Sequence, residues 1–341
     1  MSDPGNTIPS ELLGPGAAIL TSLLWVLTSL FFTTAGQRIP VTVVNTARIA
    51  LAVVLLGATH ALLYGSLWPE IHHQKQLLAL ALSGLIGLSL CDQALFTAFV
   101  DIGPRRALLC MTTSPIFAML FGIVFLDERI VGTAYAAIAV TVIGIVWVVT
   151  ERTAEPYDDS EPPPASHASK LKATFVRGLV LALIASVSQA AGGMLSKVGM
   201  GGGWLPEEHQ LPAQSATLVR MVFGLFGMAP IVLIFVALAR RNAKKASPRH
   251  RWSTGLLLTA CGTVVGPFLG VWMSLVAFKH SPLAVAQTLA SLSPVLILPF
   301  AHYVLKERVT PRAILGAVIA LIGAAALAFA EPLHAAVFTR G

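Results

Sequence analysis

The chain has 341 residues, of which 55% are hydrophobic and only 11% are charged, and its mean hydropathy is +0.77. A soluble domain carries about 25% charged residues, so this composition excludes an ordinary soluble protein and requires a lipid solvent. The net charge of +7 does not indicate a nucleic-acid partner, because the basic residues gather in connections between apolar runs, where the membrane explains them.

Ten apolar runs follow one another along the chain. Crossing about 30 Å of hydrocarbon takes roughly 20 helical residues. Barrel strands are excluded, because the runs are too long and too uniformly apolar. We therefore expect an all-α, multi-pass integral membrane protein of the cell (inner) membrane with ten transmembrane helices. The predicted spans are 12–34, 41–64, 77–100, 107–126, 130–150, 178–196, 211–239, 254–278, 281–305 and 313–330.

Residues 151–177 form the longest polar interruption and contain three consecutive prolines at 162–164. This composition favours an extended linker between a first five-helix repeat, 12–150, and a second one, 178–330. Because each repeat has an odd number of spans, the second enters the membrane in the opposite orientation, which gives inverted repeats. The count of basic residues places both termini outside, but it includes residues of a repeated motif, so the orientation stays open.

The two repeats match at an offset of 179 residues. Ser114-Pro115 falls on Ser293-Pro294, and Glu128-Arg129 falls on Glu307-Arg308. Small residues spaced by four also recur, and each triplet predicts a stripe for close helix packing, while the second triplet, with Pro267 among its glycines, has bending as an alternative further role. The triplets are Ser83, Gly87 and Cys91 in the first repeat and Gly262, Gly266 and Gly270 in the second. Two copies of one hydrophobic unit indicate a secondary transporter.

Two stretches carry a resemblance to a known family: SPIFAMLFGIVFLDERIVGTAYAAIAVTVIGIVWVV (114–149) and SLSPVLILPFAHYVLKERVTPRAILGAVIALIGAAALAF (291–329). Each resembles the pattern of EamA-type members of the drug/metabolite transporter superfamily: a proline in the fourth helix, a turn ending in Glu-Arg, and a glycine-containing fifth helix. The resemblance covers about residues 12–330 and implies a permease for amino acids, other metabolites or toxic compounds, often exported. We expect alternating access by a monomer or homodimer.

The repeated motif admits two interpretations at each position. Pro115 and Pro294 remove a backbone donor within a span and favour a kink, which either fits the bundle or contributes to a cavity wall or gate. Glu128 and Glu307 precede the next span, where a carboxylate faces the positive end of the helix dipole and can pair with the arginine that follows it. We expect these carboxylates to be structural caps and not substrate ligands.

Polar residues inside the predicted spans are the candidates for contact with a small-molecule substrate. Asp92 is the only carboxylate deep in a span, so it faces a cavity, pairs with a cation or stays protonated, and we expect it to exchange any coupling proton. Arg48 and Arg220 occupy corresponding spans and either snorkel to the interface or attract a carboxylate or phosphate. The weaker candidates are Gln93, Gln189, Lys197, Trp272 and Gln287.

We expect no metal, cofactor or enzymatic activity. Cys91, Cys110 and Cys261 lie in predicted spans without a CxxC partner, and His72-His73 lies in a loop without further ligands at metal spacing. The sequence contains no HExxH, GxSxG or Walker A motif. The alternatives are an integral-membrane enzyme or lipid-handling protein with a site near Asp92, and a passive channel, which would need polar faces along several spans.

Overall fold

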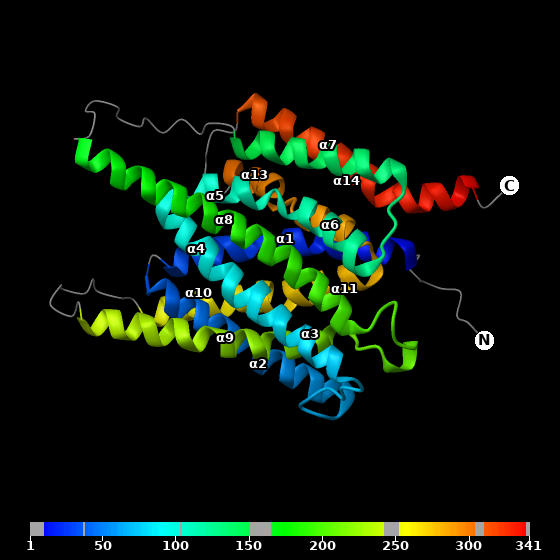
Figure 1. Cartoon of the computed structure of the whole chain (residues 1–341), viewed down its shortest axis with the longest axis horizontal. Coiled ribbons are helices and arrows are strands. Elements are labelled where there is room, and N and C mark those ends of the chain that lie inside the picture. The colour runs from blue at the N-terminus through cyan, green and yellow to red at the C-terminus, as the bar shows by residue number, and fades with distance from the viewer. Residues whose placement is uncertain are drawn as a thin grey trace. The chain divides into compact units, whose positions relative to one another are not determined.

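The computed structural model describes residues 10–36, 38–102, 104–150, 165–241, 252–303 and 310–338 (Figure 1). Within these ranges most residues are helical and no strand occurs, so the predicted all-α class is confirmed. Nine helical stretches of the described chain are long and apolar enough to cross a membrane, and Leu283–Pro299 forms a shorter apolar helix. Glu307 and Arg308 lie outside the described residues.

Apart from α8 and α14, the helices begin and end close to the predicted spans. α2 has the predicted bounds. Pro40 precedes its first residue, and Gly65 ends it at a φ of +73°, where the Gly65 N–H donates to the Ala61 carbonyl. In chain order the elements are α1 (Ser10–Gly36), α2 (Val41–Tyr64), α3 (Gln74–Gly84), η1 (Leu85–Leu90), α4 (Cys91–Ile102), α5 (Pro104–Met111), α6 (Ser114–Leu126), α7 (Gly132–Thr150), α8 (Ala165–Met200), η2 (Glu207–His209), α9 (Ala213–Arg241), α10 (Trp252–Thr263), η3 (Val264–Gly270), α11 (Val271–His280), α12 (Leu283–Ala290), α13 (Ser293–Tyr303) and α14 (Pro311–Phe338).

The sixth span starts earlier than the sequence predicts. α8 begins at Ala165, so the expectation of an extended chain over 165–177 is wrong. No proline follows Pro164 in this stretch, and extending a helix that already crosses an apolar span costs little. The preceding part of the predicted linker, 151–164, lies outside the described residues.

The third span of each repeat contains a π-helical stretch at the same place. η1 begins at Leu85 and η3 at Val264, which are 179 residues apart, the offset of the sequence repeat. Pro267 lies inside η3 and cannot donate a backbone hydrogen bond, which favours an irregular ladder there. η1 contains no proline, so its irregularity has no such local cause. π-helical turns within α-helices often occur at functional sites.

The fourth span of each repeat is broken into two helices. The turn Thr112–Thr113 separates α5 from α6, and Ser291–Leu292 separates α12 from α13. Pro115 and Pro294 are each the second residue after the break, so the expected kink within a continuous helix is corrected to a break. A proline fits there because residues in the first turn of a helix need no N–H for the ladder.

The chain forms two compact units, and each takes helices from both repeats. The first unit comprises residues 1–89 and 191–281, and the second comprises 90–190 and 282–341. The chain passes between the units within η1, within α8 and between α11 and α12.

The small-residue stripe of the first repeat lies along α8. In the first unit, Ser83 Oγ donates to the Gly192 carbonyl at 2.6 Å, and a Cβ on Gly87 would lie 2.9 Å from the Gly192 Cα. In the second unit, Cys91 Sγ donates to the Ala185 carbonyl at 3.3 Å. The stripe therefore lets backbones approach closely, as small residues do in membrane helix pairs.

The matching stripe of the second repeat lies along α1, within the first unit. A Cβ on Gly262 would lie 2.6 Å from the Phe32 ring, and one on Gly266 would lie 2.4 Å from Thr28 Oγ1. Gly270 is less crowded, with Leu24 Cβ at 3.6 Å. The two stripes thus contact the first helix of each repeat, α1 and α8.

The fifth helices of the two repeats, α7 and α14, pack against each other within the second unit (Figure 1). Gly144 and Gly323 correspond at the repeat offset and face opposite helices. A Cβ on Gly144 would lie 2.4 Å from the Ala320 nitrogen, and one on Gly323 would lie 2.6 Å from the Thr141 nitrogen. Each glycine therefore admits the backbone of the other repeat.

Candidate functional site

Two buried arginines occupy matching positions in the first unit. Arg48 follows the first residue of α2, Val41, by seven positions, as Arg220 follows Ala213 at the start of α9. Arg48 is 6% exposed and Arg220 is 4% exposed. A snorkelling arginine keeps its guanidinium group in water at the interface. The burial of Arg48 and Arg220 does not agree with that alternative.

The surroundings of the two guanidinium groups differ. A Cβ on Gly87 in η1 would lie 2.7 Å from the Nη2 atom of Arg220, and one on Gly192 would lie 3.4 Å from it. The two glycines therefore leave the space that the guanidinium fills. Arg48 instead lies over the Phe32 ring, with Cζ 5.4 Å from the ring centroid, in cation–π contact.

Thr28 lies beside the second π-helical stretch and retains hydrogen-bonding capacity. It is 1% exposed, and its Oγ1 has no hydrogen-bond partner among the described residues. Other buried threonines, such as Thr21 and Thr217, donate to the carbonyl four residues earlier. Thr28 Oγ1 faces Gly266 in η3 instead. The π-helical stretch of the second repeat therefore has a polar hydroxyl beside it.

A second polar cluster between α2 and α9 could not be predicted from the sequence pattern. His60 Nδ1 lies 2.9 Å from Gln214 Oε1 and 3.4 Å from Ser215 Oγ, and all three side chains are buried. Because Gln214 Nε2 donates to the Leu56 carbonyl, Gln214 Oε1 is an acceptor and His60 Nδ1 carries a proton. An ionisable residue inside a span is a functional hypothesis by default.

In the second unit, the structure groups Gln189 with the start of α4. Cys91 Sγ donates to Gln189 Oε1 at 3.6 Å. Asp92, the next residue, is half-buried in the first turn of α4. Gln93 is exposed and lies along its own helix, with Nε2 3.4 Å from Thr97 Oγ1. The structure therefore places Gln189 beside Cys91, the neighbour of Asp92 in the chain, while Gln93 is exposed.

Gln287 and Ser114 are polar groups of the second unit with unused hydrogen-bonding atoms. Gln287 in α12 is 4% exposed and Ser114 at the start of α6 is 1% exposed. Gln287 Oε1 and Ser114 Oγ have no partner in the part of the chain that the structure describes, and α12 packs against α6. Buried polar atoms normally find a partner, so water or a ligand group is the expected one here.

The remaining candidates serve local packing. The Trp272 ring contacts Phe268 with centroids 6.0 Å apart, across the junction of η3 and α11. Lys197 Nζ donates to the Ser281 carbonyl at 2.7 Å and so ties the end of α8 to the end of α11. The carbonyl that it satisfies is a helix-terminal one.

Glu128 caps a helix, but a different one from the helix that its sequence position suggests. Its Oε2 accepts a hydrogen bond from the Leu283 N–H at 2.7 Å, at the start of α12. Gly122 makes room for it, since a Cβ there would lie 2.6 Å from Glu128 Oε2. The carboxylate of the first repeat thus binds the positive end of a helix of the second.

An ion pair that the sequence pattern does not reveal joins α4 to α8 in the second unit. Arg177 donates through Nε and Nη2 to the two carboxylate oxygens of Asp101, at 2.8 and 2.6 Å. These bonds lower the pKa of Asp101 below its usual value, against an opposing effect of burial. Gly178 admits the pair, because a Cβ on it would lie 2.7 Å from Asp101 Cβ.

Family membership decides whether the protein belongs to a class of transporters or of membrane enzymes. A model of the EamA-like transporter family matches residues 12–150 and 176–329. The chain belongs to the EamA-like transporter family. It is therefore a multi-pass integral membrane protein of a family of transporters and not of enzymes. No group of three or more metal-ligating side chains occurs among the described residues of this EamA protein.

Comparison with solved structures supports the same fold. Matches extend to 26 chains of known structure, whereas no curated protein matches this sequence. One of these structures, described as "Crystal structure of protein", has a TM-score of 0.67 and 17% identity. The alignment covers 92% of this EamA chain and 95% of the other. At that identity the likeness concerns the fold alone.

Proposed function

We propose that this EamA-family protein is a secondary transporter that exports small metabolites, such as amino acids or related compounds, by alternating access. The observation that carries the proposal is the recurrence, at an offset of 179 residues, of a π-helical stretch followed by a broken helix. Regular ladders resist bending, and interruptions are where helices bend. Matched bending points in two repeats are what a protein needs to alternate between two related conformations.

We propose further that the sequence repeats 12–150 and 178–330 have opposite orientations in the membrane. In that arrangement, bending at the interrupted helices of one repeat opens the protein to one side of the membrane. The equivalent bending in the other repeat opens it to the opposite side.

The substrate contacts that we propose are buried polar side chains within the spans of each unit. Arg48 and Arg220 are suited to a carboxylate, because guanidinium groups bind planar anions through paired hydrogen bonds. Gln287 Oε1 has no partner among the described residues and would accept from an ammonium or amide group. Amino acids and related metabolites carry a carboxylate that the two arginines would bind, which is the reason to propose that class.

The test is counterflow into proteoliposomes that contain the purified protein. Vesicles loaded with an unlabelled amino-acid mixture should accumulate the matching labelled amino acid transiently, and protein-free vesicles should not. Saturable counterflow is expected of a carrier. A flux that rises linearly with concentration would indicate a channel, and chemical conversion of the label would indicate an enzyme. Either result would overturn the proposal.

For coupling, we propose that Asp92 exchanges a proton during transport. Asp92→Asn keeps the shape of the side chain but cannot ionise. Accumulation driven by a pH gradient should therefore be lost, while counterflow without a gradient survives. Gln93→Leu is the matched control, because Gln93 lies on the adjacent exposed face of α4. Gradient-driven accumulation that persists in Asp92→Asn would remove Asp92 from the mechanism.

A further inference from the structure

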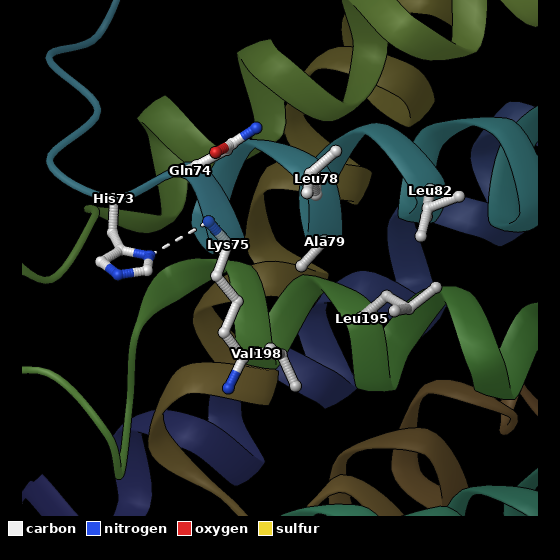
Figure 2. Close-up of a pocket in the computed structure, with 8 residues that line it drawn as sticks. All are labelled: His73, Gln74, Lys75, Leu78, Ala79, Leu82, Leu195 and Val198. Carbon is white, nitrogen blue, oxygen red and sulfur yellow. Dashed lines mark hydrogen bonds between the residues drawn. The ribbon is translucent and has the colours of Figure 1, made fainter.

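A groove runs between α3 and the end of α8 in the first unit (Figure 2). Its volume is about 440 Å³, within the range of roughly 300–1,000 Å³ of small-molecule pockets. Its lining comes from two turns of α3 with the residue before it, and from one turn of α8. The lining residues are His73, Gln74, Lys75, Leu78, Ala79, Leu82, Leu195 and Val198.

The groove is polar at one end and apolar along the rest. α3 and α8 are antiparallel, since Gly199 contacts Leu80 and Ser196 bonds to Ser83. Val198 therefore lies near the polar end with Lys75, and Leu195 lies near Leu82, as Figure 2 shows. The polar residues lie at the start of α3 or directly before it, where a predicted membrane span begins.

The apolar part of the groove is exposed at the surface of a spanning helix. Leu78 is 54% exposed and Leu82 is 46% exposed, although both lie within the apolar stretch Gln74–Phe99. Exposed leucine side chains at this depth of a spanning helix are suited to contact with acyl chains. The groove thus offers an acyl chain an apolar path along the helix pair.

The polar end is held in place by packing around Trp204. Lys75 Nζ lies 4.4 Å from the centroid of the Trp204 ring, in cation–π contact. The Trp204 Nε1–H donates to the Val198 carbonyl at 2.9 Å, and the His73 ring packs edge-on against the indole. His73 Nδ1 in turn accepts from the Lys75 N–H. Lysine and tryptophan together are typical of the membrane–water interface.

The charge at this end suits an anion. The only formal charge in the lining is the Lys75 ammonium, and the start of α3 adds the positive end of its dipole. The acidic residues of the two connections nearby in the chain, Glu70, Glu207 and Glu208, are exposed and are not part of the lining.

We propose that this groove binds an anionic phospholipid, with the phosphate at Lys75 and one acyl chain along Leu78, Leu82 and Leu195. The order of chemistry in the groove, a cation at the interface followed by an apolar channel open to lipid, matches the order of headgroup and acyl chain. This site is separate from the proposed substrate contacts, so it stands or falls independently of the transport proposal.

The test is native mass spectrometry of the purified protein with phosphatidylglycerol or phosphatidylcholine added to the detergent. Wild-type protein should retain phosphatidylglycerol preferentially. Lys75→Gln should weaken phosphatidylglycerol binding about fivefold, as expected for one basic residue near an anionic headgroup, while Lys75→Arg retains it. Arg312→Gln is the matched control, because Arg312 is also an exposed cation at the second position of a helix that begins a span.

A second pair of variants tests the acyl channel. Leu82→Trp fills the groove and should reduce retention of the bound lipid, whereas Leu257→Trp places the same bulk on another lipid-exposed helix, α10, and should not. Equal retention of the two lipids by wild-type protein, or undiminished binding in Lys75→Gln or Leu82→Trp, would overturn the proposal. Displacement of the lipid by chain-free glycerol phosphate would also overturn it, because a free phosphate site would then suffice.

Discussion

Replacing Gly87 with alanine tests whether the close approach of η1 and α8 holds the first unit together. The added Cβ would lie 2.7 Å from Arg220 Nη2 and 2.9 Å from the Gly192 Cα. The guanidinium can swing aside, but the α8 backbone must retreat by about 0.5 Å to restore an ordinary contact of 3.4 Å. Overpacking of this kind costs about 1–3 kcal/mol.

The control is Gly57→Ala in α2, where the added Cβ meets nothing within 4 Å. There the substitution should stabilise by roughly 0.5–1 kcal/mol, because alanine loses less backbone entropy in a helix. The two variants should therefore differ by about 1.5–4 kcal/mol in the free energy of unfolding. The measurement is unfolding of the purified protein in mixed detergent and sodium dodecyl sulfate, followed by tryptophan fluorescence.

A reciprocal variant distinguishes the contact from a local effect of η1. Gly192→Ala would place a Cβ 2.6 Å from the Gly87 Cα, so it should destabilise as Gly87→Ala does. The double variant should depart from additivity, since each substitution already separates the same two backbones. Equal stability of Gly87→Ala and Gly57→Ala would refute the reasoning.

Three further predictions concern separate features. Glu128→Gln should lower the free energy of unfolding by about 1 kcal/mol, because the side chain that caps Leu283 loses its charge. Substrate affinity should change little. A selective loss of affinity in folded protein would contradict this prediction. Asp101→Asn should lower the melting temperature at neutral pH. The difference in melting temperature between the variant and wild type should disappear as the pH falls through the lowered pKa of Asp101, which lies below the usual value of about 3.9. A difference that does not depend on pH would contradict this prediction. Ala243→Cys, in a variant without native cysteines, should react with an impermeant thiol reagent only after the membrane is opened. The reason is that six basic residues at 240–251 favour the cytoplasmic side. Labelling of intact cells would show that this segment lies outside.

Much of the fold was predictable from local patterns. Composition and the length of apolar runs identify the spans, because lipid demands that each helix satisfy its own backbone groups. The offset of 179 residues, read from Ser114-Pro115 and Ser293-Pro294, also relates the π-helical stretches and broken helices of the structure. The irregularity of η1 itself has no sequence signal comparable to Pro267 in η3.

The pairing of helices was decided by tertiary structure alone. The sequence marks Gly87 and Gly266 as packing positions, but only the fold assigns one to α8 and the other to α1. Likewise Glu128 was identifiable as a cap, yet its partner Leu283 is 155 residues away. In a soluble protein an apolar face reveals which side of a helix is buried. In lipid the outward face of a helix is apolar as well, so helix partners depend on close backbone approach and polar contacts that local sequence does not encode.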